Sequence, residues 1–143
     1  MSGLVIDACV AAKWLFAEED TPLAEKIFDL GASLLAPEYV RTELANVAWK
    51  RFRRADLDRA GVTVFLADPQ TLPLALTTDA TLLRAALELA VQYDHPVYDC
   101  LYVALAERAG AILVTTDRRL IAAFADTPVA PRLRHLRDHI EAA

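Results

Sequence analysis

Short apolar runs alternate along the chain with longer segments whose apolar residues recur at helical spacing. The runs 4–6, 34–36 and 111–115 are rich in leucine and β-branched residues, and each predicts a buried strand. The run 71–74 contains a proline, which removes a backbone donor, so it predicts a strand at the edge of a sheet. Residues 129–130 are a further strand candidate, and five strands are therefore expected.

The helical segments have recognisable boundaries. Thr21 and Pro22 suit the cap and the first turn of a helix, and Gly31 suits its end. The segment 98–109 is almost wholly apolar up to Gly110, which predicts a helix buried on most of its sides. The expected helices cover residues 21–30, 38–54, 56–66, 82–93, 98–109 and 118–124, and the C-terminal segment.

This alternation of strands and helices predicts parallel strand pairing with helices on both faces of the sheet. The 143 residues contain no linker, repeat or low-complexity segment, so one domain spanning residues 1–143 is expected. The predicted fold is α/β, a three-layer α/β/α sandwich around a central, mostly parallel five-stranded sheet.

Composition and charge limit the classes of function that the chain can have. Acidic residues outnumber basic ones by 20 to 15, and the net charge of −5 disfavours a protein that coats DNA, although it leaves room for an enzyme that binds a phosphodiester through metal ions. No apolar stretch is long enough to span a membrane, and residues 1–3 lack the basic start of a signal peptide, so a cytoplasmic protein is expected. Cys9 and Cys100 lack zinc-site spacing and favour reduced thiols.

Two acidic residues follow the clearest predicted strands. Asp7 ends the first strand, and Asp117 comes directly after Thr116 at the end of the strand 111–115. Open parallel sheets bind ligands beyond the carboxyl ends of their strands, so neighbouring strands would place both carboxylates in one pocket. Helix capping is the alternative role for each aspartate, because aspartate is favoured at helix starts.

Asp99 and Glu43 add two candidate carboxylates. Asp99 lies in the first turn of the apolar helix among neighbours expected in the core, so it needs a partner such as a cation or backbone amides. Glu43 shares the polar side of its helix with Asn46, and ordinary solvation is its alternative. Four converging carboxylates would repel one another unless cations neutralised them, and ligands that are all oxygen favour Mg²⁺ or Mn²⁺.

Four segments in this order resemble the motifs of PIN-domain proteins, and the presence of Lys13 and Trp14 is similar to VapC-type toxins. The segments are VIDACVAAKW at 5–14, ELAN at 43–46, YDCLYVALA at 98–106 and LVTTDRRL at 113–120. The resemblance implies a metal-dependent ribonuclease with Mg²⁺ or Mn²⁺ as cofactor. Asp7 and Asp99 would be the principal ligands, with Glu43 and Asp117 completing the site or acting through water.

The same resemblance implies partners and supporting residues. RNA would be the substrate, a VapB-type antitoxin would cover the pocket, and the chain would form a homodimer. Thr116 could orient Asp117 or cap the following helix. The family usually has Ser or Thr where this chain has Cys9, a departure that could reduce activity or shift the preference towards Mn²⁺. His95 is expected in a loop, without a catalytic role.

Several basic and aromatic residues are candidates for contacts at the protein surface. Candidate RNA-backbone contacts are Lys50, Arg54, Arg118 and Arg119, with a solvated basic surface as the alternative. Trp14, Phe16 and Trp49 are candidates for an apolar docking groove or a dimer interface, with packing in the core as the alternative. Two other functions remain open: a catalytically weak or silent binding module of the same fold, and another Mg²⁺-dependent α/β phosphotransfer protein.

Overall fold

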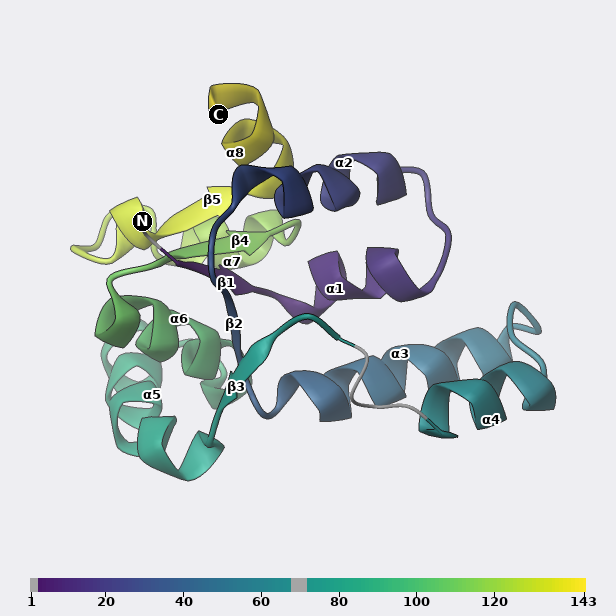
Figure 1. Cartoon of the computed structure of the whole chain (residues 1–143). Coiled ribbons are helices and arrows are strands. Elements are labelled where there is room, and N and C mark those ends of the chain that lie inside the picture. Colours follow the sequence, from purple (N-terminus) through teal and green to yellow (C-terminus); the bar gives the residue numbers. More distant parts are fainter. Residues whose placement is uncertain (1–2, 68–71) are drawn as a thin grey trace.

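The computed structural model describes residues 3–67 and 72–143, and its centre is a five-stranded sheet (Figure 1). All strand pairs are parallel and the strand order is β3-β2-β1-β4-β5, so the predicted mostly parallel sheet is confirmed and is parallel throughout. The strands are β1 (Leu4–Ile6), β2 (Leu34–Pro37), β3 (Ala75–Thr77), β4 (Ile112–Thr115) and β5 (Leu133–His135).

Helices cover both faces of the sheet, which confirms the three-layer architecture. On one face α6 (Val97–Ala109) packs on β1, β2 and β4, and α5 (Asp79–Tyr93) packs on α6. The other face carries α1 (Ala8–Leu15) and α8 (Leu136–Ala142), with α2 (Thr21–Glu25) in contact with both.

The remaining elements include a helical arm. Figure 1 shows α3 (Val40–Arg53) and α4 (Arg59–Ala67) side by side, extending away from the sheet. A 3₁₀ helix η1 (Lys26–Leu30) continues α2. Helix α7 (Arg118–Ala123) follows β4, and a short 3₁₀ helix η2 (Ala130–Arg132) precedes β5.

The two edge strands lie later in the chain than predicted. Strand β3 begins at Ala75, and of the expected strand 71–74 residue 71 lies outside the described residues. The expected strand 129–130 is wrong, because Val129 is buried in a turn and residue 130 begins η2. An edge strand pairs on one side only and can be polar, as Arg134 and His135 in β5 are, so the apolar pattern does not locate it.

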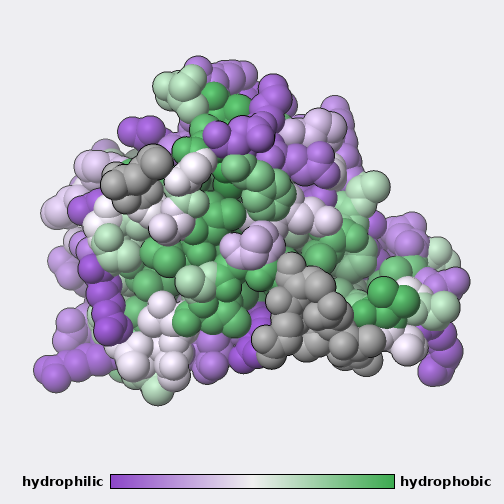
Figure 2. Space-filling model, viewed as in Figure 1, coloured by the Kyte–Doolittle hydropathy of each residue, from purple (hydrophilic) through white to green (hydrophobic). Residues whose placement is uncertain are grey.

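The core is centred on α6, where residues Cys100 to Ala106 are all buried, as the apolar sequence predicted. Helix α1 was not predicted, because its eight residues directly after β1 are mostly apolar and too few for a helical repeat to be recognised. On the face shown in Figure 2, hydrophobic residues gather across the middle of the molecule. Within the described ranges, no helix combines the length and apolarity needed to cross a membrane.

Candidate active site: a carboxylate centre at the ends of β1 and β4

Strand β1 is the point where the sheet is extended in two opposite directions. The chain leaves β1 for β2 on one side and returns to β4 on the other, and ligands bind at such switch points in parallel sheets. Ile6 pairs with Val114, so the next residues, Asp7 and Thr115, lie beside each other. The Thr115 hydroxyl donates a hydrogen bond of 2.6 Å to Asp7 Oδ2, which fixes the carboxylate at the carboxyl edge of the sheet.

Asp7 is only 6% exposed. Burial raises its pKa to about 6, and the negative charge of Asp99 acts in the same direction, while the hydrogen bond from Thr115 opposes both. A buried carboxylate next to a second acidic group is unfavourable unless a cation joins them. Asp7 and Asp99 therefore lie in one electrostatic centre.

Glu43 enters the same centre from the first turn of α3. The hydroxyl of Tyr102, which is fully buried in α6, donates to Glu43 Oε1. The pKa of Glu43 is raised to about 7, chiefly by burial and also by the charges of Asp7 and Asp99, while the hydrogen bond from Tyr102 opposes the rise. Burial and the neighbouring Glu43 also raise the pKa of Tyr102, so its hydroxyl stays protonated and keeps donating. The alternative of a fully solvated Glu43 is wrong.

Asp99 has a partner that the sequence did not suggest. His95 Nε2 lies 2.8 Å from Asp99 Oδ2, and the imidazole packs edge-on against Phe124. His95 is in the loop before α6, as predicted, but it contacts the carboxylate centre. The neighbours of Asp99 are also not all in the core, because Tyr98 is 57% exposed. The i,i+4 spacing of His95 and Asp99 was the available signal for this pair.

Asp117 is held by the backbone at the start of α7. Its Oδ1 accepts hydrogen bonds from the backbone N–H groups of Arg119 (2.9 Å) and Leu120 (3.3 Å), so it caps α7. Its own N–H donates to Thr115 Oγ1 at 3.0 Å. Thus Thr115, not Thr116, supplies the hydroxyl at the centre, and the carboxylates brought together are those of Asp7, Glu43 and Asp99.

Cys9 belongs to the hydrogen-bond network around Thr115. Its Sγ accepts from the Thr116 N–H at 3.3 Å and lies 3.5 Å from Thr115 Oγ1. Burial raises the pKa of the thiol to about 12, with the charge of Asp7 adding to this, so the sulfur is a neutral thiol at physiological pH. Cys9 therefore supports Thr115 and Thr116 rather than acting as a thiolate.

The predicted basic contacts lie in two places. Lys50 and Arg54 line, with Arg53, a pocket of about 380 Å³ at the end of α3, and Arg54 also pairs with Asp56 at 3.5 Å. Arg118 and Arg119 are exposed at the start of α7. Asn46 is exposed on α3, and no hydrogen bond of its side chain supports the site in the described structure.

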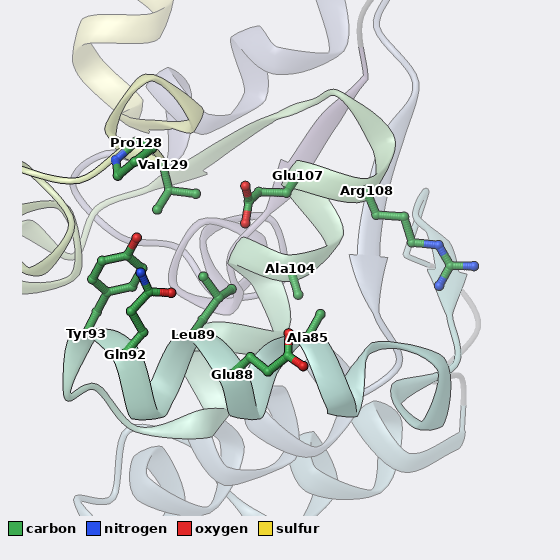
Figure 3. A pocket seen from close by; sticks show the side chains of 10 residues that line it. All are labelled: Ala85, Glu88, Leu89, Gln92, Tyr93, Ala104, Glu107, Arg108, Pro128 and Val129. Carbon is green, nitrogen blue, oxygen red and sulfur yellow. The ribbon is translucent and has the colours of Figure 1, made fainter.

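A second cavity has a volume of about 510 Å³ (Figure 3). It opens between α5, α6 and Val129, with Glu107 pointing into it and Arg108 pointing away. Glu107 is eight residues beyond Asp99 along α6, about 12 Å at 1.5 Å per residue. None of Asp7, Glu43 and Asp99 lines this cavity, so it is separate from the carboxylate centre.

The chain matches the PIN domain family model over residues 4–126. It is 34% identical over 123 residues to Ribonuclease VapC3 of Pyrobaculum aerophilum, and the match covers 85% of this chain and 94% of that protein. Solved structures extend the likeness of the fold. The match to the crystal structure of PAE2754 from P. aerophilum covers 99% of this chain and 88% of the PAE2754 chain, with 23% identity and a TM-score of 0.70.

Two structures of toxins share the fold as well. One is VapC20 of Mycobacterium tuberculosis, described as a sarcin-ricin loop cleaving toxin. The match covers 85% of this chain and 95% of the VapC20 chain, with 18% identity and a TM-score of 0.64. The match to a toxin-antitoxin complex from Klebsiella pneumoniae covers 94% of this chain and 98% of the matched chain, with 15% identity and a TM-score of 0.61. With its carboxylate centre at the sheet edge, this chain belongs to the PIN-domain family and, within it, to the VapC-type ribonucleases.

Proposed function

We propose that this protein hydrolyses RNA phosphodiester bonds with Mg²⁺ or Mn²⁺ held by Asp7, Glu43 and Asp99, as the toxin of a VapBC-type pair. The observation that carries the proposal is the convergence of these three carboxylates, from β1, α3 and α6, at the carboxyl edge of the sheet. Neighbouring negative charges raise the pKa of Asp7 and of Glu43, and a divalent cation would relieve this repulsion.

The donor set fits a hard cation. Thr115, Tyr102 and His95 each hold one oxygen of a carboxylate, so the second oxygen of each acid can serve as a ligand. Within residues 3–67 and 72–143, no three acidic, histidine or cysteine side chains already stand at metal-binding distances. We therefore expect small side-chain rotations on binding. Oxygen ligands favour Mg²⁺ or Mn²⁺ over softer ions.

The protein's own groups prepare the site for hydrolysis. A bound divalent ion would lower the pKa of a water molecule and offset charge on the phosphate. Thr115, Tyr102 and His95 orient the three acids, and Cys9 and Thr116 support Thr115. We assign Asp117 an outer role: its N–H fixes Thr115, and its carboxylate acts through water while capping α7.

The activity is tested directly with purified protein and a labelled 12-nucleotide single-stranded RNA. Cleavage is expected with Mg²⁺ or Mn²⁺, loss of cleavage with EDTA, and recovery when excess Mn²⁺ is added back. Cleavage that persists in EDTA would contradict the metal requirement. No cleavage with either ion would identify a catalytically silent member of the fold.

Lys50 and Arg54 are proposed as sequence-independent contacts to the RNA backbone, and Arg118 and Arg119 as a second set beside β4. The double variant Lys50→Ala/Arg54→Ala is expected to weaken binding of all RNA sequences alike. The slope of log affinity against log salt should fall by about 1 for each phosphate that the variant leaves unneutralised. Arg84→Ala, which removes an exposed arginine of α5, is the matched control. An unchanged slope in the double variant would show that these residues are solvated.

The proposed partners are a VapB-type antitoxin and a second copy of the chain. Of the three aromatic candidates, Trp49 is 50% exposed and available for docking. Trp14 instead donates to Ala24 O and packs on Phe28, and Phe16 lies under the Arg51 guanidinium. An RNA substrate and two free cysteines favour a cytoplasmic location.

A further inference from the structure

Two tyrosines stack beside the carboxylate centre. Tyr39 directly precedes α3, and Tyr98 directly precedes Asp99 in the first turn of α6. Their ring centroids are 5.3 Å apart with an interplanar angle of 22°, which is a stacked arrangement. The two rings therefore join the starts of the helices that carry Glu43 and Asp99.

The stack is close to the acids and firmly held. Tyr98 is the residue before Asp99, and the Tyr39 carbonyl accepts a hydrogen bond of 3.1 Å from the Glu43 N–H, so each ring belongs to the same helix start as one of the acids. The Tyr39 N–H donates to Asp79 Oδ1 at 3.0 Å, which ties the start of α3 to the start of α5. The rings are thus positioned before any ligand arrives.

Packing alone does not account for Tyr98. Tyr102, one turn further along α6, is completely buried and bonds to Glu43, whereas Tyr98 is 57% exposed. Tyr39 covers one face of the Tyr98 ring, and the exposure leaves much of the ring open to solvent. A large aromatic ring that is fixed next to Asp99 and exposed to solvent is suited to receive another flat ring.

We propose that Tyr98, backed by Tyr39, is a stacking platform for an unpaired nucleobase next to the phosphodiester bond held at Asp7, Glu43 and Asp99. This inference rests on the proposed ribonuclease function. Every base has a π-face, so stacking tolerates different sequences but requires a base that is not already stacked in a duplex. The platform therefore directs the enzyme to single strands and loops.

The test compares two 12-nucleotide probes, labelled oligoadenylate and the same backbone with abasic positions, by fluorescence anisotropy in Ca²⁺ buffer. Wild type and Tyr98→Phe are expected to bind oligoadenylate about 5- to 150-fold more tightly than the abasic probe, the range typical of one stacked base. Tyr98→Leu should bind both probes equally. Val91→Ala, which trims an exposed side chain of α5, should match wild type.

Three results would overturn the platform: no preference for bases in wild type, no RNA binding at all, or equal weakening on both probes by Tyr98→Leu. Equal weakening would assign Tyr98 to folding or to a protein partner, and thermal melting of the variant separates these two roles. Base-dependent binding by a wild-type protein that cleaves no RNA with Mn²⁺ would remove the nuclease proposal and leave the platform standing.

Discussion

Asp7→Asn is expected to lower the rate of RNA cleavage by about 10²–10³-fold or more, the size of effect seen when one electrostatic group is removed from a catalytic centre. The amide keeps the shape of the carboxylate and can still accept the Thr115 hydrogen bond, so the fold should be retained. Asp99→Asn should lower the cleavage rate by a similar factor. Rates are measured with saturating Mn²⁺, and Mn²⁺ affinity is measured by calorimetry.

Asp117→Asn is the informative comparison. Since its carboxylate caps α7 through two backbone N–H groups, and asparagine caps helices about as well as aspartate, the change should cost little activity and little stability. Asp126→Asn, at an exposed position beyond α7, should alter neither property. A loss of activity in Asp117→Asn as large as that in Asp7→Asn would mean that Asp117 turns into the centre with the metal.

The metal-free protein is expected to be less stable at pH 8 than at pH 5. Burial raises the pKa of Asp7 from 3.8 to about 6, so the folded state holds a proton that the unfolded state releases. Stability is therefore lost as pH rises from below 3.8 to above 6, by about 3 kcal/mol for Asp7 in total, of which about 1.4 kcal/mol falls between pH 5 and pH 8. Glu43, with its pKa raised to about 7, extends the loss towards neutral pH.

The measurement is urea unfolding of EDTA-treated protein at both pH values. Asp7→Asn should remove much of the difference and be more stable than wild type at pH 8, because no buried charge forms. Mn²⁺ should stabilise wild type at pH 8 more than it stabilises the variant. An unfolding free energy that is equal at pH 5 and pH 8 would contradict buried, mutually repelling acids. Asp126→Asn again serves as the control.

The parts of the fold that were predictable are those with a strong local signal. Strands β1 and β4 are buried on both faces, so their apolar runs locate them within one residue. Helix α6 is buried on most sides and ends at Gly110, which adopts φ +62 in the left-handed region. The edge strands β3 and β5 lack this burial, and their positions depended on pairing with β2 and β4.

The candidate site divides in a similar way. The sequence alone determined that acids follow β1 and occupy the first turns of α3 and α6, because strand ends and helix starts are encoded by nearby residues. Only the tertiary structure decided which atoms meet. Thr115 contacts Asp7 across 108 residues, Tyr102 contacts Glu43 across 59, and Asp117 turns to α7 instead. Such contacts depend on strand register and helix orientation, which hydrophobic periodicity along the chain does not encode.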